Sequence, residues 1–338
     1  MPLARKTCTK CHDELSVYRR TYSGEYLCKK CFLVSIEQKT AKTMQKFSML
    51  GQKDKVAVGV SGGKDSLALL YVLKKFFVDH NRTDLVAITI DEGISHYRDE
   101  SLQIVKDFCS CIKVETKISS YRELFGLDMD QAMLQRPSEK MTSCSVCGTF
   151  RRRAIDMAAE SIGASVVATA HNLDDQLQTF MINVLSGDTE RIGWIYPEPV
   201  QYGPNGLKKV KPFVEIYEHE IVFYAVLREI PFQSEECPYM HESIRTNLRV
   251  FFNNLESAHA GIKYNAYNSM SKISKILKTS SSGSISNSKR CSICGRISTN
   301  SICSVCKTLQ VLSKNTNSDG YITITGALSN SSKNDRQI

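Results

Sequence analysis

The string SGGKDS at residues 61–66 constrains the fold of this chain more than any other feature, because it stands between a short apolar strand and an apolar helix. A β-branched run from Val56 to Val60 precedes it, and five leucines and valines between Leu67 and Leu73 follow it at helical spacing. Two glycines let the backbone approach a phosphate, the helix start directs N–H groups towards it, and Lys64 adds a positive charge. The sequence therefore predicts a phosphate-binding loop after a buried strand.

Buried-strand patterns recur along the chain and alternate with helical stretches. Continuous apolar strands that alternate with helices are typical of a parallel sheet covered on both faces, so the sequence predicts an α/β, doubly wound fold. The expected strands are 56–60, 85–93, 113–118 and 164–172, and the expected helices are 32–50, 97–109, 150–162, 173–186, 216–229 and 242–278.

Eight of the 13 cysteines form two compact sets, each with the pattern CxxC, a spacer and CxxC, and the spacers are 16 and 8 residues long. The chain is long and begins without an apolar export segment, so we expect a reducing compartment, where a metal explains such sets better than disulfides. Four thiolates complete the tetrahedron of a structural zinc ion and leave no open position. The expected zinc ligands are Cys8, Cys11, Cys28 and Cys31 in the first set, and Cys291, Cys294, Cys303 and Cys306 in the second.

A third CxxC pair, Cys144 and Cys147, has no second pair, and Cys237 stands alone before a proline. Three thiolates can hold a metal with one position open, or can carry sulfur as a persulfide. Inert buried thiols are the remaining possibility.

SGGKDS is not a Walker P-loop, because that motif needs glycine where this chain has Val58 and Ser or Thr where it has Asp65. It resembles the PP-loop of the N-type ATP pyrophosphatases, HUP-like proteins that cleave ATP between the α and β phosphates. Together with CSVCGTFRR at 144–152, HNLDDQLQT at 171–179, Cys237-Pro238 and both four-cysteine sets, it resembles the cytoplasmic tRNA 2-thiolation protein 1 family and its TtuA-type relatives over residues 5–307.

The resemblance implies roles for individual residues. Many relatives have glycine at the positions of Ala170 and His96, and His96 is expected to be exposed without a role. The ATP contacts implied are Ser61, Gly62, Gly63, Lys64, Asp65, Ser66, Ile90, Arg151 and Ala170; Asp175 would position Mg²⁺; Cys144, Cys147 and Cys237 would hold a 4Fe-4S cluster; and the catalytic residues would be Lys64, Asp65, Asp175, Cys144 and Cys237.

The family resemblance also implies an activity and partners. ATP adenylates the C2 oxygen of a tRNA uridine, and sulfur then replaces that oxygen. The expected target is the wobble uridine, U34, of tRNAs for Lys, Glu and Gln, with U54 as an alternative target and a cysteine persulfide as an alternative to the cluster. The expected partners are tRNA, a thiocarboxylated ubiquitin-like sulfur carrier, and either the cytoplasmic tRNA 2-thiolation protein 2 or a second copy of the chain. We expect a cytoplasmic protein without a membrane span.

Charge is distributed unevenly, which agrees with a polyanionic partner. Residues 1–55 carry 12 basic and 5 acidic side chains, residues 56–244 carry 19 and 27, and residues 245–338 carry 13 and 3. Basic ends around an acidic middle suit tRNA held by the flanks. We therefore expect charge reversal at Arg19 and Arg20 to weaken tRNA binding, and Tyr18, Tyr22 and Tyr26 to offer either base-stacking surfaces or packing within the zinc module. The basic zinc-module residues are Arg5, Lys6, Lys10, Arg19, Arg20, Lys29 and Lys30 at one end and Lys289, Arg290, Arg296 and Lys307 at the other, and Arg245, Arg249, Lys272, Lys275 and Lys278 add basic helical surface.

Three other functions are weighed against tRNA thiolation. A non-catalytic zinc-ribbon RNA-binding protein would not need SGGKDS. ATP-dependent amidation would need a glutaminase segment, and a tRNA lysidine synthase would not need the three unpaired cysteines.

The domain boundaries expected from the sequence are an N-terminal zinc module at 1–35, a PP-loop domain with its linking helix at 36–240, a helical extension at 241–278, a linker at 279–290, a C-terminal zinc module at 291–311 and a disordered tail at 312–338.

Overall fold

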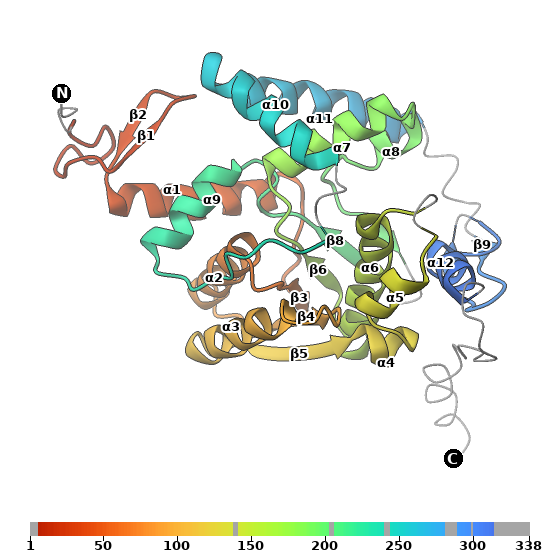
Figure 1. The fold of residues 1–338 in the computed structure, drawn as a ribbon. Helices are drawn as coiled ribbons and strands as arrows, with labels where there is room; N and C mark the ends of the chain where they lie inside the picture. Colours follow the sequence, from red (N-terminus) through yellow and green to blue (C-terminus); the bar gives the residue numbers. More distant parts are fainter. Residues whose placement is uncertain are drawn as a thin grey trace.

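A computed structural model describes residues 6–137, 141–202, 206–239, 244–280, 289–298 and 300–313. Its centre is a six-stranded sheet with the order β5-β4-β3-β6-β8-β7 (Figure 1). The first five strands in that order are parallel, and β7 pairs antiparallel with β8, which confirms the predicted α/β fold. The strands are β3 (Val56–Gly59), β4 (Leu85–Asp91), β5 (Glu115–Ser120), β6 (Val166–Ala168), β7 (Gln201–Tyr202) and β8 (Leu207–Val210).

Helices cover both faces of the sheet, and side-chain alternation along β3 decides which core each residue joins. Val56 and Val58 pack in one core with α2 (Lys64–Asp79) and α3 (Arg98–Cys111), whereas Ala57 packs in the other core with α6 (Ser143–Ser161). The remaining helices are α1 (Lys29–Lys46), α4 (Tyr121–Phe125), α5 (Met129–Gln135), α7 (Leu173–Leu185), α8 (Thr189–Gly193), α9 (Glu218–Leu227), α10 (Ile244–Ala258), α11 (Ile262–Ser280) and α12 (Ser304–Ser313).

Two sequence predictions about helices need correction. The helix expected at 150–162 begins earlier, at Ser143, because the Thr142 hydroxyl accepts a hydrogen bond from the Ser145 N–H and caps it. The single helix expected over 242–278 is two helices, since Gly261 between them has a φ of +90°, a conformation that L side chains rarely adopt. The first correction places the CxxC pair in the opening turn of α6.

The strand β8 was not predicted from the sequence. Its sequence, LKKV, has two lysines at its centre, so it lacks the apolar run of a buried strand. In the fold the Lys208 ammonium lies 3.6 Å from a carboxylate oxygen of Asp54. The Lys209 ammonium lies 2.7 Å from a carboxylate oxygen of Asp156. These ion pairs with residues distant in sequence allow a charged strand to pair with β6.

The carboxyl ends of the parallel strands meet at one edge of the sheet, where ligands bind in open α/β folds. SGGKDS follows β3, Glu92 follows β4, His171 lies shortly after β6, and Lys211 follows β8. The chain order changes direction at β3, which pairs with β4 on one side and β6 on the other. The fold therefore brings these four segments to one edge.

The N-terminal four-cysteine module packs against α9 through a buried ion pair. A hairpin of β1 (Tyr18–Arg20) and β2 (Glu25–Leu27) lies between its two CxxC pairs. The Arg20 guanidinium donates to Glu220 at 2.7 Å, to Glu25 at 3.0 Å and to the Ser35 hydroxyl at 2.9 Å. The Tyr22 ring stacks on Tyr217 with centroids 4.8 Å apart. Tyr18 contacts Phe32 and Phe223, so Tyr18 and Tyr22 serve packing rather than base stacking.

Arg20 is buried, which corrects its prediction as a tRNA contact. Its side chain is 7% exposed and that of Glu220 is 0% exposed. We expect Arg20→Ala to lower the free energy of unfolding by about 3–5 kcal/mol, because it leaves the Glu220 carboxylate buried without its partner. Urea unfolding measures this change. The exposed neighbour Arg19→Ala is the control and should change stability by less than about 0.5 kcal/mol; equal effects from both variants would contradict the role assigned to Arg20.

The C-terminal four-cysteine module packs on the opposite face of the sheet. It contains β9 (Lys289–Arg290), β10 (Ile297–Ser298) and α12, and its buried cysteines join the core that contains α6. The Arg296 guanidinium donates to Glu160 of α6 at 2.8 Å. Each four-cysteine module thus extends one of the two cores. Arg5 and the bulk of the expected linker and tail, residues 281–288 and 314–338, lie outside the described residues, among which no helix is long and apolar enough to cross a membrane.

Candidate active site

The loop after β3 has the backbone geometry of a phosphate cradle. Gly62 has a φ of +87°, and an added Cβ would lie 2.8 Å from the Cβ and carbonyl oxygen of Ser101, so only glycine fits there. The Ser66 hydroxyl donates to the Gly63 carbonyl at 2.9 Å and accepts from the Ser61 N–H at 3.1 Å. Gly63 is the N-cap of α2 and makes no side-chain cap bond. The first N–H groups of α2 are therefore available to an anion.

Lys64 is held at the loop by two carboxylates. Its ammonium donates to Glu218 at 3.0 Å and to Asp65 at 3.2 Å. Glu218 is the first residue of α9, and its N–H donates to Asp174 at 2.8 Å. Asp174 in turn forms a buried ion pair with Lys263 of α11. Lys64 thus lies where the beginnings of α2, α7, α9 and α11 meet.

The acidic groups beside Lys64 repel one another. Burial raises the pKa of Asp65 to about 6, with further contributions from Glu218 and Asp175, although Lys64 acts in the opposite direction. Burial also raises the pKa of Asp175, whose carboxylate caps α7 by accepting from the Asn172 N–H at 3.1 Å. The Oδ1 atom of Asp65 is buried and has no hydrogen-bond partner among the described residues. A buried carboxylate oxygen without a hydrogen-bond partner, in an acidic cluster, is a suitable ligand for Mg²⁺.

The third CxxC pair lies in the first turn of α6, so Cys144 and Cys147 project from one helix face. Cys144 is exposed, while Cys147 and Cys237 are half-buried. The Ser143 hydroxyl donates to the Tyr239 carbonyl at 2.9 Å, and the Tyr239 hydroxyl donates to Asp130 at 2.8 Å. These bonds hold Cys237 beside the start of α6.

The three thiols are close enough to interact, but they are more widely spaced than ligands of a single ion. Burial raises the pKa of Cys237, and the charges of Cys147 and Cys144 raise it further. Among the described residues, only the two four-cysteine sets have ligand atoms that all lie within 4.8 Å of one another. Wider spacing fits an iron–sulfur cluster, since each cysteine then binds a different iron atom.

One segment connects the phosphate loop to the three cysteines. The Gln233 N–H donates to the Gly62 carbonyl at 3.0 Å, and the Gln233 side chain donates to the Tyr97 carbonyl at 2.8 Å. These two bonds fix the start of the segment against the loop. Further along, the chain reaches Cys237 and then Tyr239, which contacts α6. One continuous segment thus joins the phosphate loop to Cys237.

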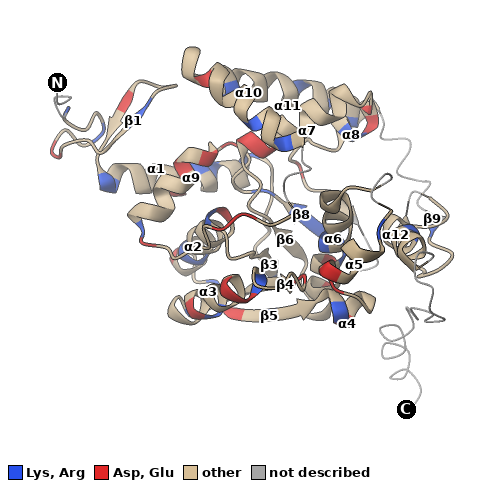
Figure 2. Ribbon diagram, viewed as in Figure 1, with Lys and Arg blue, Asp and Glu red and all other residues tan. Residues whose placement is uncertain are grey.

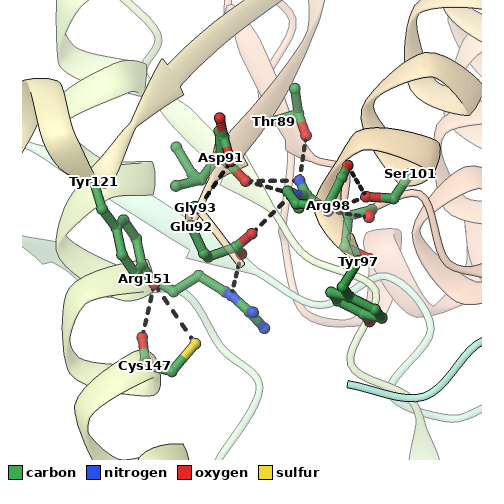
Figure 3. A network of polar contacts seen from close by, with 12 residues as sticks. Thr89, Asp91, Glu92, Gly93, Tyr97, Arg98, Ser101, Tyr121, Cys147 and Arg151 are labelled. Atoms are coloured by element: carbon green, nitrogen blue, oxygen red, sulfur yellow. Dashed lines mark hydrogen bonds and ion pairs between the residues drawn. The ribbon is translucent and has the colours of Figure 1, made fainter. Parts of the chain in front are cut away.

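A buried ion network lies beneath the same region (Figure 3). Glu92 is 3% exposed and pairs with two arginines, Arg98 at 2.8 Å and Arg151 at 2.9 Å. The Arg98 guanidinium also donates to the Ser61 carbonyl at 2.6 Å and to the Thr89 hydroxyl at 2.8 Å. The charge of Glu92 raises the pKa of Arg151. The Arg151 guanidinium is thus fully charged in the fold.

The other implied ATP positions lie at the same edge of the sheet. Ile90 is buried near the end of β4, and its carbonyl accepts two bonds from Arg98, at 2.6 and 3.0 Å. Ala170 is half-buried between β6 and α7. His96 is exposed as expected and has a φ of +61°, which explains why glycine suits that position.

A basic group of residues lies next to Asp175. Desolvation by neighbouring protein atoms lowers the pKa of His171 to about 3, and the charges of Lys211, Arg245 and Arg152 act in the same direction, although the residue is partly exposed. The imidazole is therefore neutral at physiological pH. Burial and the charge of Arg245 act against the attraction of Asp175 and lower the pKa of Lys211 to about 8. Figure 2 shows basic residues on β8 and α10, the elements near this group.

The two four-cysteine sets fit zinc. A tetrahedral ion with Zn–S bonds of about 2.3 Å separates its thiolates by about 3.8 Å, and the Cys11–Cys28 and Cys294–Cys303 sulfur atoms lie 3.9 and 3.8 Å apart. Burial raises the pKa of Cys8, but N–H groups of Cys11, Cys28 and Lys10 outweigh it and lower the pKa to about 6. The corresponding Cys291 is also lowered in pKa to about 6, despite burial, by backbone hydrogen bonds. These hydrogen bonds favour the thiolate form of one cysteine in each set, whereas burial raises the pKa of Cys28, Cys31, Cys294 and Cys306.

Sequence reasoning missed several residues of this site. Glu92, Arg98 and Glu218 are charged residues whose partners come from distant elements, and Gln233 and Tyr239 act through backbone bonds. One signal was available for Glu92, because an acidic residue directly after a buried strand of a parallel sheet falls at the ligand-binding edge. No sequence pattern connects Glu218 to Lys64.

Comparisons with known proteins agree with this geometry. Residues 33–255 match the PP-loop domain family. Cytoplasmic tRNA 2-thiolation protein 1 of Drosophila sechellia is 37% identical over 78% of this chain and 75% of its own length. The protein of that name from Laccaria bicolor is 36% identical over 76% and 72%. The U34-tRNA thiolase NcsA from Methanococcus maripaludis, solved with its 4Fe-4S cluster, has a TM-score of 0.76 and 30% identity, covering 90% of this chain and 95% of its own. The chain therefore belongs to the cytoplasmic tRNA 2-thiolation protein 1 family and contains its PP-loop domain.

Proposed function

We propose that this chain is an ATP-dependent tRNA sulfurtransferase that converts a uridine to 2-thiouridine, with the wobble uridine U34 as its target. The observation that carries the proposal is that the phosphate loop and three unpaired cysteines lie at one edge of the sheet, linked by the Gln233 segment and by Glu92. A non-catalytic RNA-binding protein has no use for this arrangement. The relatives named above support the tRNA substrate.

The first step is the activation of a poor leaving group. The C2 oxygen of uridine attacks the α-phosphorus of ATP, the bond to the β-phosphate oxygen breaks, and pyrophosphate leaves. We assign ATP binding to Ser61, Gly62, Gly63, Lys64, Asp65 and Ser66, with Ile90, Arg151 and Ala170 as further contacts. Lys64 would leave Glu218 for the phosphates and stabilise the charge that develops on pyrophosphate. Asp65 and Asp175 would hold Mg²⁺, which supplies further positive charge when bound.

The second step replaces oxygen with sulfur. A sulfide attacks C2 of the adenylated uridine, the bond between C2 and oxygen breaks, and AMP leaves with that oxygen. Cys144, Cys147 and Cys237 would hold a 4Fe-4S cluster, which when bound offers one iron without a protein ligand to a sulfide. Arg151 lies close enough to Cys147 and Cys237 for its charge to interact with theirs. Its positive charge is therefore available to the departing AMP.

The tRNA would be held by exposed basic residues. Arg19 and Lys10 on the N-terminal module, Lys272 and Lys275 on α11, and Arg245 near Asp175 all reach solvent. Arg20 is excluded from this set because it is buried.

Zinc in both four-cysteine sets would hold the modules in shape. The domain boundaries expected from the sequence, a cytoplasmic location, a thiocarboxylated ubiquitin-like donor, and a partner subunit or second copy belong to the same proposal.

A reconstituted reaction tests the proposal. Anaerobically purified protein, ATP, Mg²⁺ and sulfide are incubated with a tRNA transcript for Lys, Glu or Gln, and 2-thiouridine is measured by mass spectrometry of nucleosides. We expect 2-thiouridine and pyrophosphate in equal amounts, and neither with a transcript that carries cytidine at position 34. Product that survives this substitution would move the target to another uridine such as U54. Pyrophosphate release independent of tRNA, without thiolated product, would contradict the proposed function.

A further inference from the structure

Glu92 carries one negative charge and pairs with two positively charged arginines. It pairs with Arg98 through Oε2 at 2.8 Å and with Arg151 through Oε1 at 2.9 Å, and it is almost completely buried. Two guanidinium groups share one carboxylate, so the triad has one excess positive charge. Which arginine can bind a further anion depends on the exposure and the hydrogen bonds of each guanidinium group.

Arg98 is the closed member of the triad. Its side chain is 5% exposed, and all three of its nitrogens are used in hydrogen bonds. Besides Glu92, it binds the Ser61 carbonyl of the phosphate loop, the Ser101 hydroxyl, the Thr89 hydroxyl and the Ile90 carbonyl. Arg98 therefore fixes the phosphate loop to the end of β4.

Arg151 is the open member. Its Nε atom is bound to Glu92, and its terminal nitrogens have no hydrogen bond to any residue in the described ranges. The side chain is 45% exposed, and Figure 3 shows the terminal nitrogens turned away from Glu92. A guanidinium held at Nε still presents two terminal nitrogens as donors to an anion.

We propose that Glu92 is a positioning residue that holds Arg151 ready for the α-phosphate of ATP and for the AMP that leaves. This inference rests on the proposed function, because it takes the α-phosphate as the anion. An exposed arginine with no such partner would distribute among many side-chain conformations, and ordering it on ligand binding would cost affinity. Glu92 removes that cost, since a buried carboxylate directly after β4 fixes one end of the guanidinium.

The backbone after β4 is built to place Glu92 in this way. The Asp91 carboxylate accepts from the Gly93 N–H at 2.9 Å, and the Glu92 carbonyl accepts from the Met129 N–H at 2.7 Å. Gly93 has a φ of +67°, and an added Cβ would lie 2.4 Å from the Asp128 Cβ. This turn therefore requires glycine and directs the Glu92 side chain towards both arginines.

The test measures ligand affinity rather than thiolation, so that it is separate from the test of the proposed function. Isothermal titration calorimetry on the full chain compares AMP with pyrophosphate, which would occupy the phosphate loop but has no adenylate group. We expect Glu92→Gln and Arg151→Gln each to weaken AMP binding about ten-fold, and to leave pyrophosphate binding within about two-fold. The double variant should bind AMP no more weakly than either single variant, because Glu92 acts through Arg151.

Three outcomes would overturn the proposal. The first is unchanged AMP affinity in Glu92→Gln. The second is an equal loss of affinity for AMP and for pyrophosphate, which would indicate that Glu92 only supports the loop. The third is a loss of AMP affinity in the double variant that equals the product of the two single losses. The exposed Asp99→Asn on α3 is the matched control for removal of one negative charge and should bind both ligands normally. If Glu92→Gln does not fold, Arg151→Lys decides, since an ammonium cannot bind Glu92 and a phosphate with the same planar fork. Unchanged AMP affinity in that variant would also overturn the proposal, whatever the outcome of the thiolation assay.

Discussion

Lys64→Ala should reduce tRNA-dependent pyrophosphate release by about 10²–10³-fold, the loss expected when one positioned charge is removed from a developing anion. Lys64 is the first residue of α2 and lies at the phosphate loop, where its ammonium contacts only the carboxylates of Glu218 and Asp65 among the described residues. ATP offers this ammonium a more highly charged partner. Steady-state pyrophosphate release at saturating ATP and tRNA gives the measurement.

A second lysine on the same helix provides the control for Lys64. Lys74 lies on α2 far from the loop, and its ammonium donates to the Lys113 carbonyl at 3.3 Å. Lys74→Ala should retain the rate of the unaltered protein within about two-fold. A Lys64→Ala protein that folds normally and releases pyrophosphate at an undiminished rate would remove Lys64 from the reaction.

Cys237→Ser should abolish thiolation and release the iron, while zinc remains bound. Cys237 comes from a loop that is held to α6 by the bond between Ser143 and Tyr239, whereas the eight cysteines expected to bind zinc lie in two separate modules. The experiment measures iron, zinc and acid-labile sulfide in anaerobically purified protein. We expect about four iron and two zinc ions per chain before the substitution, and only the zinc afterwards. ATP affinity should not change, because Lys64 and the loop are intact.

Cys111 provides the matched control for Cys237, since it is an exposed cysteine at the end of α3. Cys111→Ser should keep the full complement of iron and the full thiolation rate. Zinc without iron in the unaltered protein, combined with normal thiolation, would exclude a cluster. It would instead support sulfur transfer by a persulfide on Cys144, Cys147 or Cys237.

Local sequence patterns predicted the elements that depend on short-range physics. Apolar runs rich in β-branched residues gave β3 and β4, and helical spacing gave α2, α3, α7 and α9. SGGKDS between a strand and a helix indicated the phosphate loop, and the cysteine spacing indicated two metal modules whose sulfur separations fit zinc. These features are encoded within a few residues, so the sequence alone was enough.

Other features depend on partners that are distant along the chain. The LKKV strand β8 forms because Asp54 and Asp156 neutralise its lysines. Arg20 carries the same charge as Arg19, yet the alternation of β1 buries it against Glu220, two hundred residues away in sequence. Residue type alone could not distinguish an RNA-binding arginine from a buried one.

The sequence by itself determined the sheet class, the phosphate loop, the two four-cysteine sets and the candidate chemistry of the three remaining cysteines. Only the tertiary structure decided that Glu92 joins Arg98 and Arg151, that Glu218 contacts Lys64, and that Gln233 links the loop to the cysteine site. Parallel strands separated by helices bring their carboxyl ends to one edge, so residues far apart in the chain become neighbours there. The sequence does not show which partner a charged side chain or a hydrogen-bond donor contacts, because the packing of distant elements decides it.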